Sequence, residues 1–263
     1  MKRFTIFAIA LLALTGNALV FTNFGHQTIA ALAEKYMTDK AKSEVRTILK
    51  GDMVTASTWL NTLRDEEATA YTKEWHIFTL DKNHKSTTTA ENDGTVQLEK
   101  AISVLRNRAN ESESLVATSL RTVIHLVGDM HCLSHIHIDG IEETKGFEFP
   151  VSNEATGKAH KVKMRSWSYV WQGVFLNRYT IFSPQYYADD IDIYANSKKA
   201  EYEKGTPRFW VENGGEDVVR ALEQFNTGDD VLQQTLLNHE YNHTKTMAQA
   251  GYRLAALLND IFK

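Results

Sequence analysis

Residues 121–135 read RTVIHLVGDMHCLSH, and this stretch decides how the 263-residue chain is interpreted. It places three histidines, one aspartate and the only cysteine in an otherwise apolar, helical run. On a helix, His125 and Asp129 lie one turn apart on the same face, among apolar neighbours that are buried with them. A buried carboxylate beside a buried imidazole is costly unless both are satisfied, and a divalent metal satisfies both. A histidine–aspartate hydrogen bond in a helix interface is the alternative, and this stretch alone supports the two equally.

Further polar residues stand among apolar ones elsewhere in the chain. They are His26, Asn61 and His76, together with His135 at the end of the central stretch. Imidazoles combined with one carboxylate are the typical ligands of hydrolytic zinc. We therefore expect a metal site, provided that these segments meet in the fold.

The remaining histidines and the cysteine receive less weight. His239 and His243 lie four residues apart among polar neighbours, which predicts a solvated helix face. His131 is two residues from Asp129 and so lies on another face, either as a support for a ligand or as a surface residue. Cys132 stands on an apolar helix and is interpreted as core filler rather than as a nucleophile.

The composition predicts a single domain, and the N-terminal sequence predicts that the protein is exported. The chain is 43% hydrophobic with three prolines, and no break in composition marks a second domain. Lys2 and Arg3 precede an apolar run and small residues up to Ala18, a pattern typical of a signal peptide at 1–18, leaving a domain at 19–263. No segment is apolar for long enough to span a membrane. A formal net charge of −4, which cleavage makes more negative, excludes a general electrostatic surface for nucleic acid.

Hydrophobic periodicity predicts an all-α, single multi-helix domain with one small β-hairpin. We expect helices at 26–36, 40–50, 55–64, 95–110, 114–132, 167–178, 185–204, 206–225 with an interruption at Gly214-Gly215, and 229–262. Residues 75–81 look extended, and 147–149 with 160–164 form the predicted hairpin around 153–158. The polar loop at 82–94 is the most flexible stretch expected in the mature chain.

Five phrases in this sequence carry a family resemblance. They are FGHQTIAALAEKYM, STWLNTLRD, KEWHIFTLD, VIHLVGDMHCLSH and AGYRLAALLNDIF. In order and spacing they resemble the secreted zinc-dependent single-strand nucleases and 3′-nucleotidases of fungi, plants and bacteria, which are related to the bacterial zinc-dependent phospholipases C. The resemblance runs from the mature N-terminus to the C-terminus.

The resemblance implies a helical fold that holds three zinc ions, at which water attacks a phosphate ester. It implies one zinc at Asn61, His76, His125 and Asp129, a second at the Phe21 backbone, His26 and Asp129, and a third at His135 with two further residues. Asp129 would bridge the first two ions, and Arg64 would lie near the phosphate.

Several positions depart from the family pattern. Asn61 replaces an aspartate, and Ser168 and Gln172 stand where the third zinc should have a histidine and an aspartate. Phe21 replaces the usual N-terminal tryptophan. A neutral amide binds zinc less well than a carboxylate, and one ligand is too few for a third site. We therefore expect one or two zinc ions.

The resulting hypothesis is a secreted or periplasmic, monomeric zinc phosphoesterase that acts on single-stranded nucleic acid or nucleotides, with impaired activity. Asp129 and Arg64 would be its catalytic residues. The alternatives are a phospholipase C-like phosphodiesterase and a catalytically inactive family member that binds a ligand.

Overall fold

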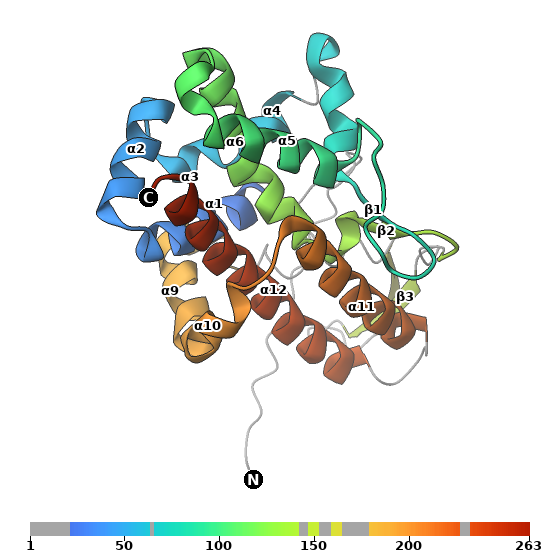
Figure 1. Cartoon of the computed structure of the whole chain (residues 1–263). Coiled ribbons are helices and arrows are strands. Elements are labelled where there is room, and N and C mark those ends of the chain that lie inside the picture. Colours follow the sequence, from blue (N-terminus) through green and yellow to red (C-terminus); the bar gives the residue numbers. More distant parts are fainter. Residues whose placement is uncertain (1–21, 64–65, 142–146, 153–158, 165–178, 227–231) are drawn as a thin grey trace.

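The computed structural model describes residues 22–63, 66–141, 147–152, 159–164, 179–226 and 232–263. The helices, including the 3₁₀ helices marked η, are α1 (Asn23–Tyr36), α2 (Asp39–Leu49), α3 (Met53–Ala56), α4 (Trp59–Leu63), η1 (Glu67–His76), α5 (Gly94–Arg106), η2 (Arg108–Asn110), α6 (Glu113–Met130), η3 (Leu133–His135), α9 (Pro184–Ala195), η5 (Asn196–Lys198), α10 (Lys199–Tyr202), α11 (Pro207–Asn226) and α12 (Leu232–Ile261). The strands are β1 (Phe78–Leu80), β2 (Ile136–Ile138), β3 (Phe147–Ser152) and β4 (Ala159–Met164). The predicted all-α class is confirmed (Figure 1).

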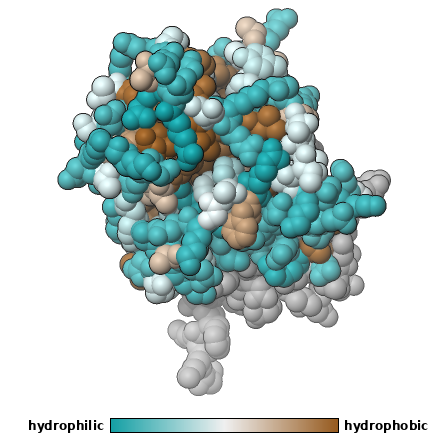
Figure 2. All heavy atoms as spheres, in the orientation of Figure 1, coloured by the Kyte–Doolittle hydropathy of each residue, from teal (hydrophilic) through white to brown (hydrophobic). Residues whose placement is uncertain are grey.

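Helix α6 runs through the centre of the molecule. Ser112 caps its N-terminus by accepting a hydrogen bond from the Leu115 amide, and every residue from Thr122 to Met130 is buried. Helix α5 packs along α6, while α1 packs on both α12 and α9 (Figure 1). Each fully buried valine or leucine in this core contributes roughly 1.5–3 kcal/mol. On the outside, hydrophilic residues cover most of the face in Figure 2, with apolar residues visible between them.

The single helix expected at 55–64 is wrong, because α3 and α4 are separated at Ser57 and Thr58. The Ser57 hydroxyl donates to the Val54 carbonyl at 2.6 Å, and the Thr58 hydroxyl donates to the Thr55 carbonyl at 3.2 Å. Side-chain bonds of this kind compete with the helical ladder and favour its interruption. The break leaves the Ser57 carbonyl available to another part of the chain.

Two short strand pairs accompany the helices. The predicted hairpin is confirmed, since β3 and β4 pair antiparallel with Phe147 opposite Met164. The extended segment expected at 75–81 is correct only in part, because Trp75 and His76 end the 3₁₀ helix η1. Strand β1 pairs in parallel with β2, and Phe78 lies opposite Ile136. This pairing joins two segments that each follow a histidine.

The expected interruption at Gly214-Gly215 is also wrong, because α11 is continuous through both glycines. A Cβ atom at Gly214 would collide with Ile136, and one at Gly215 would collide with Leu80. The glycines are therefore there for close packing: they let α11 lie directly on the β1–β2 pair. That close approach outweighs the cost of about 1 kcal/mol for each glycine in a helix.

The polar loop after β1 is anchored to α11. The Arg208 guanidinium donates to the Ser86 and Thr88 carbonyls at 2.6 and 3.1 Å, and Glu212 accepts from the Ser86 amide at 3.1 Å. No helix within the described ranges is long and apolar enough to cross a membrane. The leader expected at 1–18 and the helix expected at 167–178 lie outside those ranges.

Candidate metal centre

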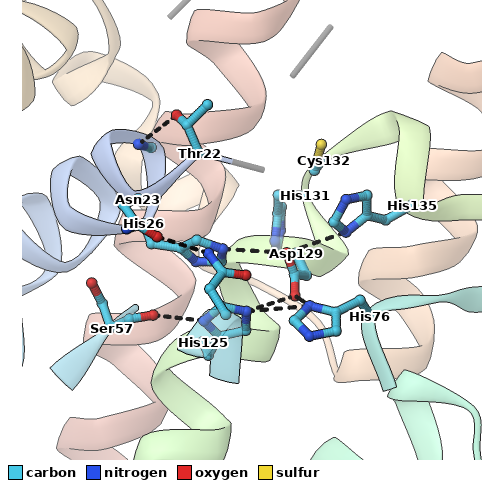
Figure 3. Close-up of polar contacts among 12 residues, drawn as sticks. Thr22, Asn23, His26, Ser57, His76, His125, Asp129, His131, Cys132 and His135 are labelled. Atoms are coloured by element: carbon cyan, nitrogen blue, oxygen red, sulfur yellow. Dashed lines mark hydrogen bonds and ion pairs between the residues drawn. The ribbon is translucent and has the colours of Figure 1, made fainter. Parts of the chain in front are cut away.

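Four histidines from separate parts of the chain surround the carboxylate of Asp129 (Figure 3). Oδ1 lies 3.3 Å from Nε2 of His26 and 3.2 Å from Nδ1 of His135. Oδ2 lies 2.6 Å from Nδ1 of His76 and 3.0 Å from Nε2 of His125. The structure thus brings together five of the residues predicted as ligands, with two imidazoles at each carboxylate oxygen.

The cluster is closed to solvent. Asp129 and His125 are fully buried, and none of the other three histidines is more than 5% exposed. The rings of His26 and His125 stack with their centroids 3.8 Å apart. So many polar groups in the core are costly unless a partner satisfies them.

Local sequence explains how each histidine reaches the cluster. His26 lies in the first turn of α1, which begins where the Thr22 side chain accepts from the Gly25 amide. Gly128 makes room for its ring, since a Cβ atom there would lie 2.7 Å from Nδ1 of His26. His76 ends η1 and His135 ends η3, and the parallel pairing of β1 with β2 places these two ends side by side.

The break between α3 and α4 orients His125. Its Nδ1 lies 2.6 Å from the Ser57 carbonyl oxygen, which can only accept a hydrogen bond. Nδ1 therefore carries a proton, and Nε2 is the ring nitrogen that faces Asp129 and His76 and that could bind a metal. Metal-binding histidines are commonly oriented in this way by a backbone carbonyl.

The electrostatics of the cluster favour an ionised carboxylate at Asp129. Burial alone would raise the pKa of Asp129, but the four surrounding histidines outweigh it and hold that pKa well below its usual range. Burial, followed by the neighbouring His125, lowers the pKa of His26 to about 3. An ionised carboxylate beside an unprotonated imidazole is the protonation state that a metal requires.

These residues fit a metal ion. One ligand atom each from His26, His125 and Asp129 lies within 4.8 Å of the others. Nε2 of His76 is buried and has no hydrogen-bond partner within the described ranges. Nitrogen and carboxylate ligands in a buried set of this size are typical of zinc.

The other predicted site residues are less fully placed. Asn61 lies on α4, which packs against α6 and η1, and its Nδ2 donates to Oδ1 of Asn23 at 3.0 Å. Phe21, Arg64, Ser168 and Gln172 lie outside the described ranges.

One histidine differs from expectation, and for another the structure decides between the two predicted alternatives. His243 is 1% exposed, so the predicted solvated face is wrong at this position. Its spacing of four residues from Met247, and four more to Gly251, was the signal that could have shown it. His131 is buried and not a surface residue: Nδ1 donates to the Val127 carbonyl at 2.7 Å, and Nε2 accepts from Arg253. Cys132 is buried, and burial raises the pKa of its thiol, which is against a role as nucleophile.

An ionised carboxylate encircled by imidazoles, on a helical frame, defines a candidate metal centre of the kind that zinc hydrolases use. The family model described as S1/P1 Nuclease matches residues 21–263, so the chain belongs to that family, and the resemblance seen in the sequence is confirmed. The chain is also similar to nuclease S1 of Aspergillus oryzae, with 23% identity over 291 aligned positions covering 98% of each protein. The family is generally zinc-dependent, and membership implies a nucleic acid substrate.

Proposed function

We propose that this chain is an exported, zinc-dependent phosphodiesterase that cleaves single-stranded nucleic acid or nucleotides at the Asp129 cluster. The observation that carries the proposal is the arrangement of two imidazoles at each oxygen of one buried, ionised carboxylate. Membership of the S1/P1 nuclease family is the second observation that supports the proposal. The N-terminal pattern of residues 1–18 supports export, to the periplasm or beyond, and we propose a monomer.

Most of the ligands that we propose belong to this cluster. They are His26, His76, His125, Asp129 and His135, with the Asn61 amide and the Phe21 backbone as further ligands. Because Asp129 presents both oxygens, it can be shared between two positions. One or two zinc ions is therefore the number that we propose.

Each chain residue has a distinct part in the chemistry. Zinc, when bound, lowers the pKa of water and stabilises negative charge on a phosphate. Asp129 stays ionised, and the Ser57 carbonyl keeps Nε2 of His125 turned into the cluster. We propose that Arg64 orients the phosphate. Turnover should be slow, because Asn61 is neutral and Ser168 and Gln172 replace two ligands.

A ligand-binding protein without catalysis is the second candidate. The Asn61 amide favours it, because Nδ2 is hydrogen-bonded to Asn23 and the position offers no negative charge to a metal. In this case the cluster holds a metal without supporting hydrolysis.

The test is hydrolysis by the purified chain, stripped with a chelator and reloaded with zinc. Single-stranded DNA, double-stranded DNA and phosphatidylcholine vesicles serve as substrates. We expect release of acid-soluble nucleotides from single-stranded DNA, abolished by Asp129→Asn. The matched control is Asp192→Asn, which alters a carboxylate that is also buried but is bonded to Tyr36 and Tyr252.

Three other outcomes would count against the proposed activity at the Asp129 cluster. Zinc binding without any turnover would support the ligand-binding protein. Hydrolysis of the vesicles alone would support the phospholipase-like activity. Loss of nucleotide release in Asp192→Asn, with its fold intact, would show that the Asp129 cluster is not specifically responsible.

A further inference from the structure

Arg253, on α12, is a buried cation that contacts two other helices and the residue that follows α6. It is 3% exposed. Nη1 donates to Nε2 of His131 at 2.7 Å, and Nε donates to the Tyr202 carbonyl at 2.9 Å. The guanidinium lies 5.5 Å from the centre of the Trp210 ring. One side chain thus connects α12 to α10, to α11 and to the residue that follows α6.

The contact with Arg253 fixes the state of His131. A guanidinium has no acceptor, so Nε2 of His131 must accept, and its Nδ1 proton then goes to the Val127 carbonyl at 2.7 Å. The His131 amide also donates to the Gly128 carbonyl and closes the helix end. The ring therefore spans the last turn of α6, from Val127 to His131.

That turn carries Asp129. After it, the chain passes through Cys132, whose amide donates to the Asp129 carbonyl at 2.9 Å, and reaches His135. In the sequence, His131 thus lies between two members of the metal cluster, and its contacts with Val127 and Arg253 hold this segment in place. A shift of this turn would move Asp129 and His135 relative to His76 and His125.

Packing alone does not explain an arginine here. The direct contacts of Arg253 are with a carbonyl, an imidazole and an indole ring; within the described ranges no carboxylate lies in ion-pair contact with it, and Asp217 acts on it only as a nearby charge that raises its pKa. By contrast, Arg208 forms a two-pronged contact with Glu99. Burying a cation without a carboxylate in direct contact is unfavourable, as the lowered pKa of Arg253 indicates, and an apolar residue would fill the same space without that cost.

We propose that Arg253 is a positioning residue of the metal centre, which holds the last turn of α6 through His131 so that Asp129 and His135 meet the other ligands. The inference rests on the proposed function, because it takes the Asp129 cluster to bind zinc. Arg253 touches neither metal nor substrate, so its effect is on the affinity and geometry of the metal site.

The test compares Arg253→Met with Arg108→Met as matched control. Arg108 is also a partly buried arginine that donates to carbonyls, of Leu105 and Ile261, and lies 5.0 Å from the Phe262 ring centre, but it does not contact the α6 end. Zinc affinity is measured by competition with a chromophoric chelator, the ligand geometry by the visible spectrum of bound Co²⁺, and the fold by thermal unfolding without metal.

We expect Arg253→Met to weaken zinc binding about tenfold or more, the range seen when outer partners of metal ligands are removed, and to change the Co²⁺ spectrum. Arg108→Met should lower thermal stability and leave both metal readouts unchanged. Arg253→Lys keeps the charge but loses the planar fork, so we expect an intermediate affinity. If Arg253→Met does not fold, the zinc affinity and Co²⁺ spectrum of Arg253→Lys provide the test instead.

Coupling tests the route through His131. The zinc affinity of the double variant, His131→Leu with Arg253→Met, should be no lower than that of whichever single variant binds zinc less tightly. Additive losses would overturn this route. Wild-type zinc affinity and an unchanged Co²⁺ spectrum in the folded Arg253 variants would overturn the inference while the proposed function stands, whereas a wild-type chain that binds no zinc would overturn both.

Discussion

Asp129 is the residue on which the site depends, because it stays ionised in the absence of any solvent contact. Burial by itself would favour the neutral acid, and the four imidazoles reverse that preference. Asn61, which we propose as a further ligand, is by contrast a neutral amide, and its Nδ2 is bonded to Asn23. The number of charges offered to a cation is therefore set by single side chains.

Replacing Asn61 by aspartate should strengthen zinc binding. Two opposite unit charges 4 Å apart attract by about 4 kcal/mol at an effective dielectric constant of 20, and desolvation offsets much of this. We expect a gain of about tenfold in zinc affinity for Asn61→Asp, measured by chelator competition. The metal-free variant should unfold more easily, because the new carboxylate faces Oδ1 of Asn23. No gain over wild type or over Asn61→Ala would show that this position lies outside the metal site.

For single residues, the sequence indicated which side chains belong to the site but not which atoms they contact. Polar side chains among apolar neighbours identified His26, His76, His125, Asp129 and His135. The partner of His131 could not be predicted, because Arg253 is distant in sequence and no local pattern links them. The Ser57 carbonyl was missed for a similar reason, since backbone atoms carry no signature of their own.

Among the elements, the packing of α1 on α6 and the pairing of β1 with β2 bring the histidines together. Two glycines make comparable close contacts. A Cβ atom at Gly128 would lie 2.7 Å from the His26 ring, and one at Gly251 would lie 2.7 Å from Leu32. The first contact is in the site and the second is in the core, which gives a matched pair of substitutions.

Gly128→Ala should therefore weaken zinc binding, whereas Gly251→Ala should not. Alanine gains about 1 kcal/mol of helix propensity over glycine, but overpacking costs about 1–3 kcal/mol, so both variants should lose stability. Urea unfolding and zinc competition check the two effects. If both substitutions lowered stability and neither changed zinc affinity, the close approach of His26 at Gly128 would be irrelevant to the metal.

Element types were more predictable than their interruptions. The apolar periodicity predicted α6 and the hairpin β3–β4 from local sequence. It failed at 55–64, where hydroxyls break the helix, and at Gly214-Gly215, where the need to pack on Leu80 and Ile136 overrides weak helix propensity. The parallel pairing of β1 with β2 joins segments distant in sequence, and such pairing leaves no local trace.

Over the whole molecule, Asp192 ties three helices together. Oδ1 accepts from the Tyr36 hydroxyl of α1 and from the Tyr252 hydroxyl of α12, each at 2.7 Å, and Oδ2 pairs with Lys35 at 2.7 Å. Burial, followed by the bond to Asp192, raises the pKa of Tyr36 to about 12, and the pKa of Tyr252 is raised for the same reasons.

This network predicts a loss of stability at alkaline pH. Below about pH 10 the tyrosines are protonated in both folded and unfolded chains, and the stabilisation is fully present. From about pH 10 to about 12 the unfolded chain releases protons that the folded chain retains, so the free energy of unfolding should fall. Urea unfolding at several pH values measures this fall. Tyr252→Phe should make it shallower, and an identical slope in the variant would contradict the role of the network.

The metal centre can be tested by a crystal structure of the chain grown with zinc, with diffraction data collected on both sides of the zinc absorption edge. We expect one or two anomalous peaks, each about 2.0–2.2 Å from an oxygen of Asp129 and from histidine nitrogens of the cluster. Anomalous peaks elsewhere, or none while the four histidines still contact Asp129 directly, would contradict the proposed metal centre.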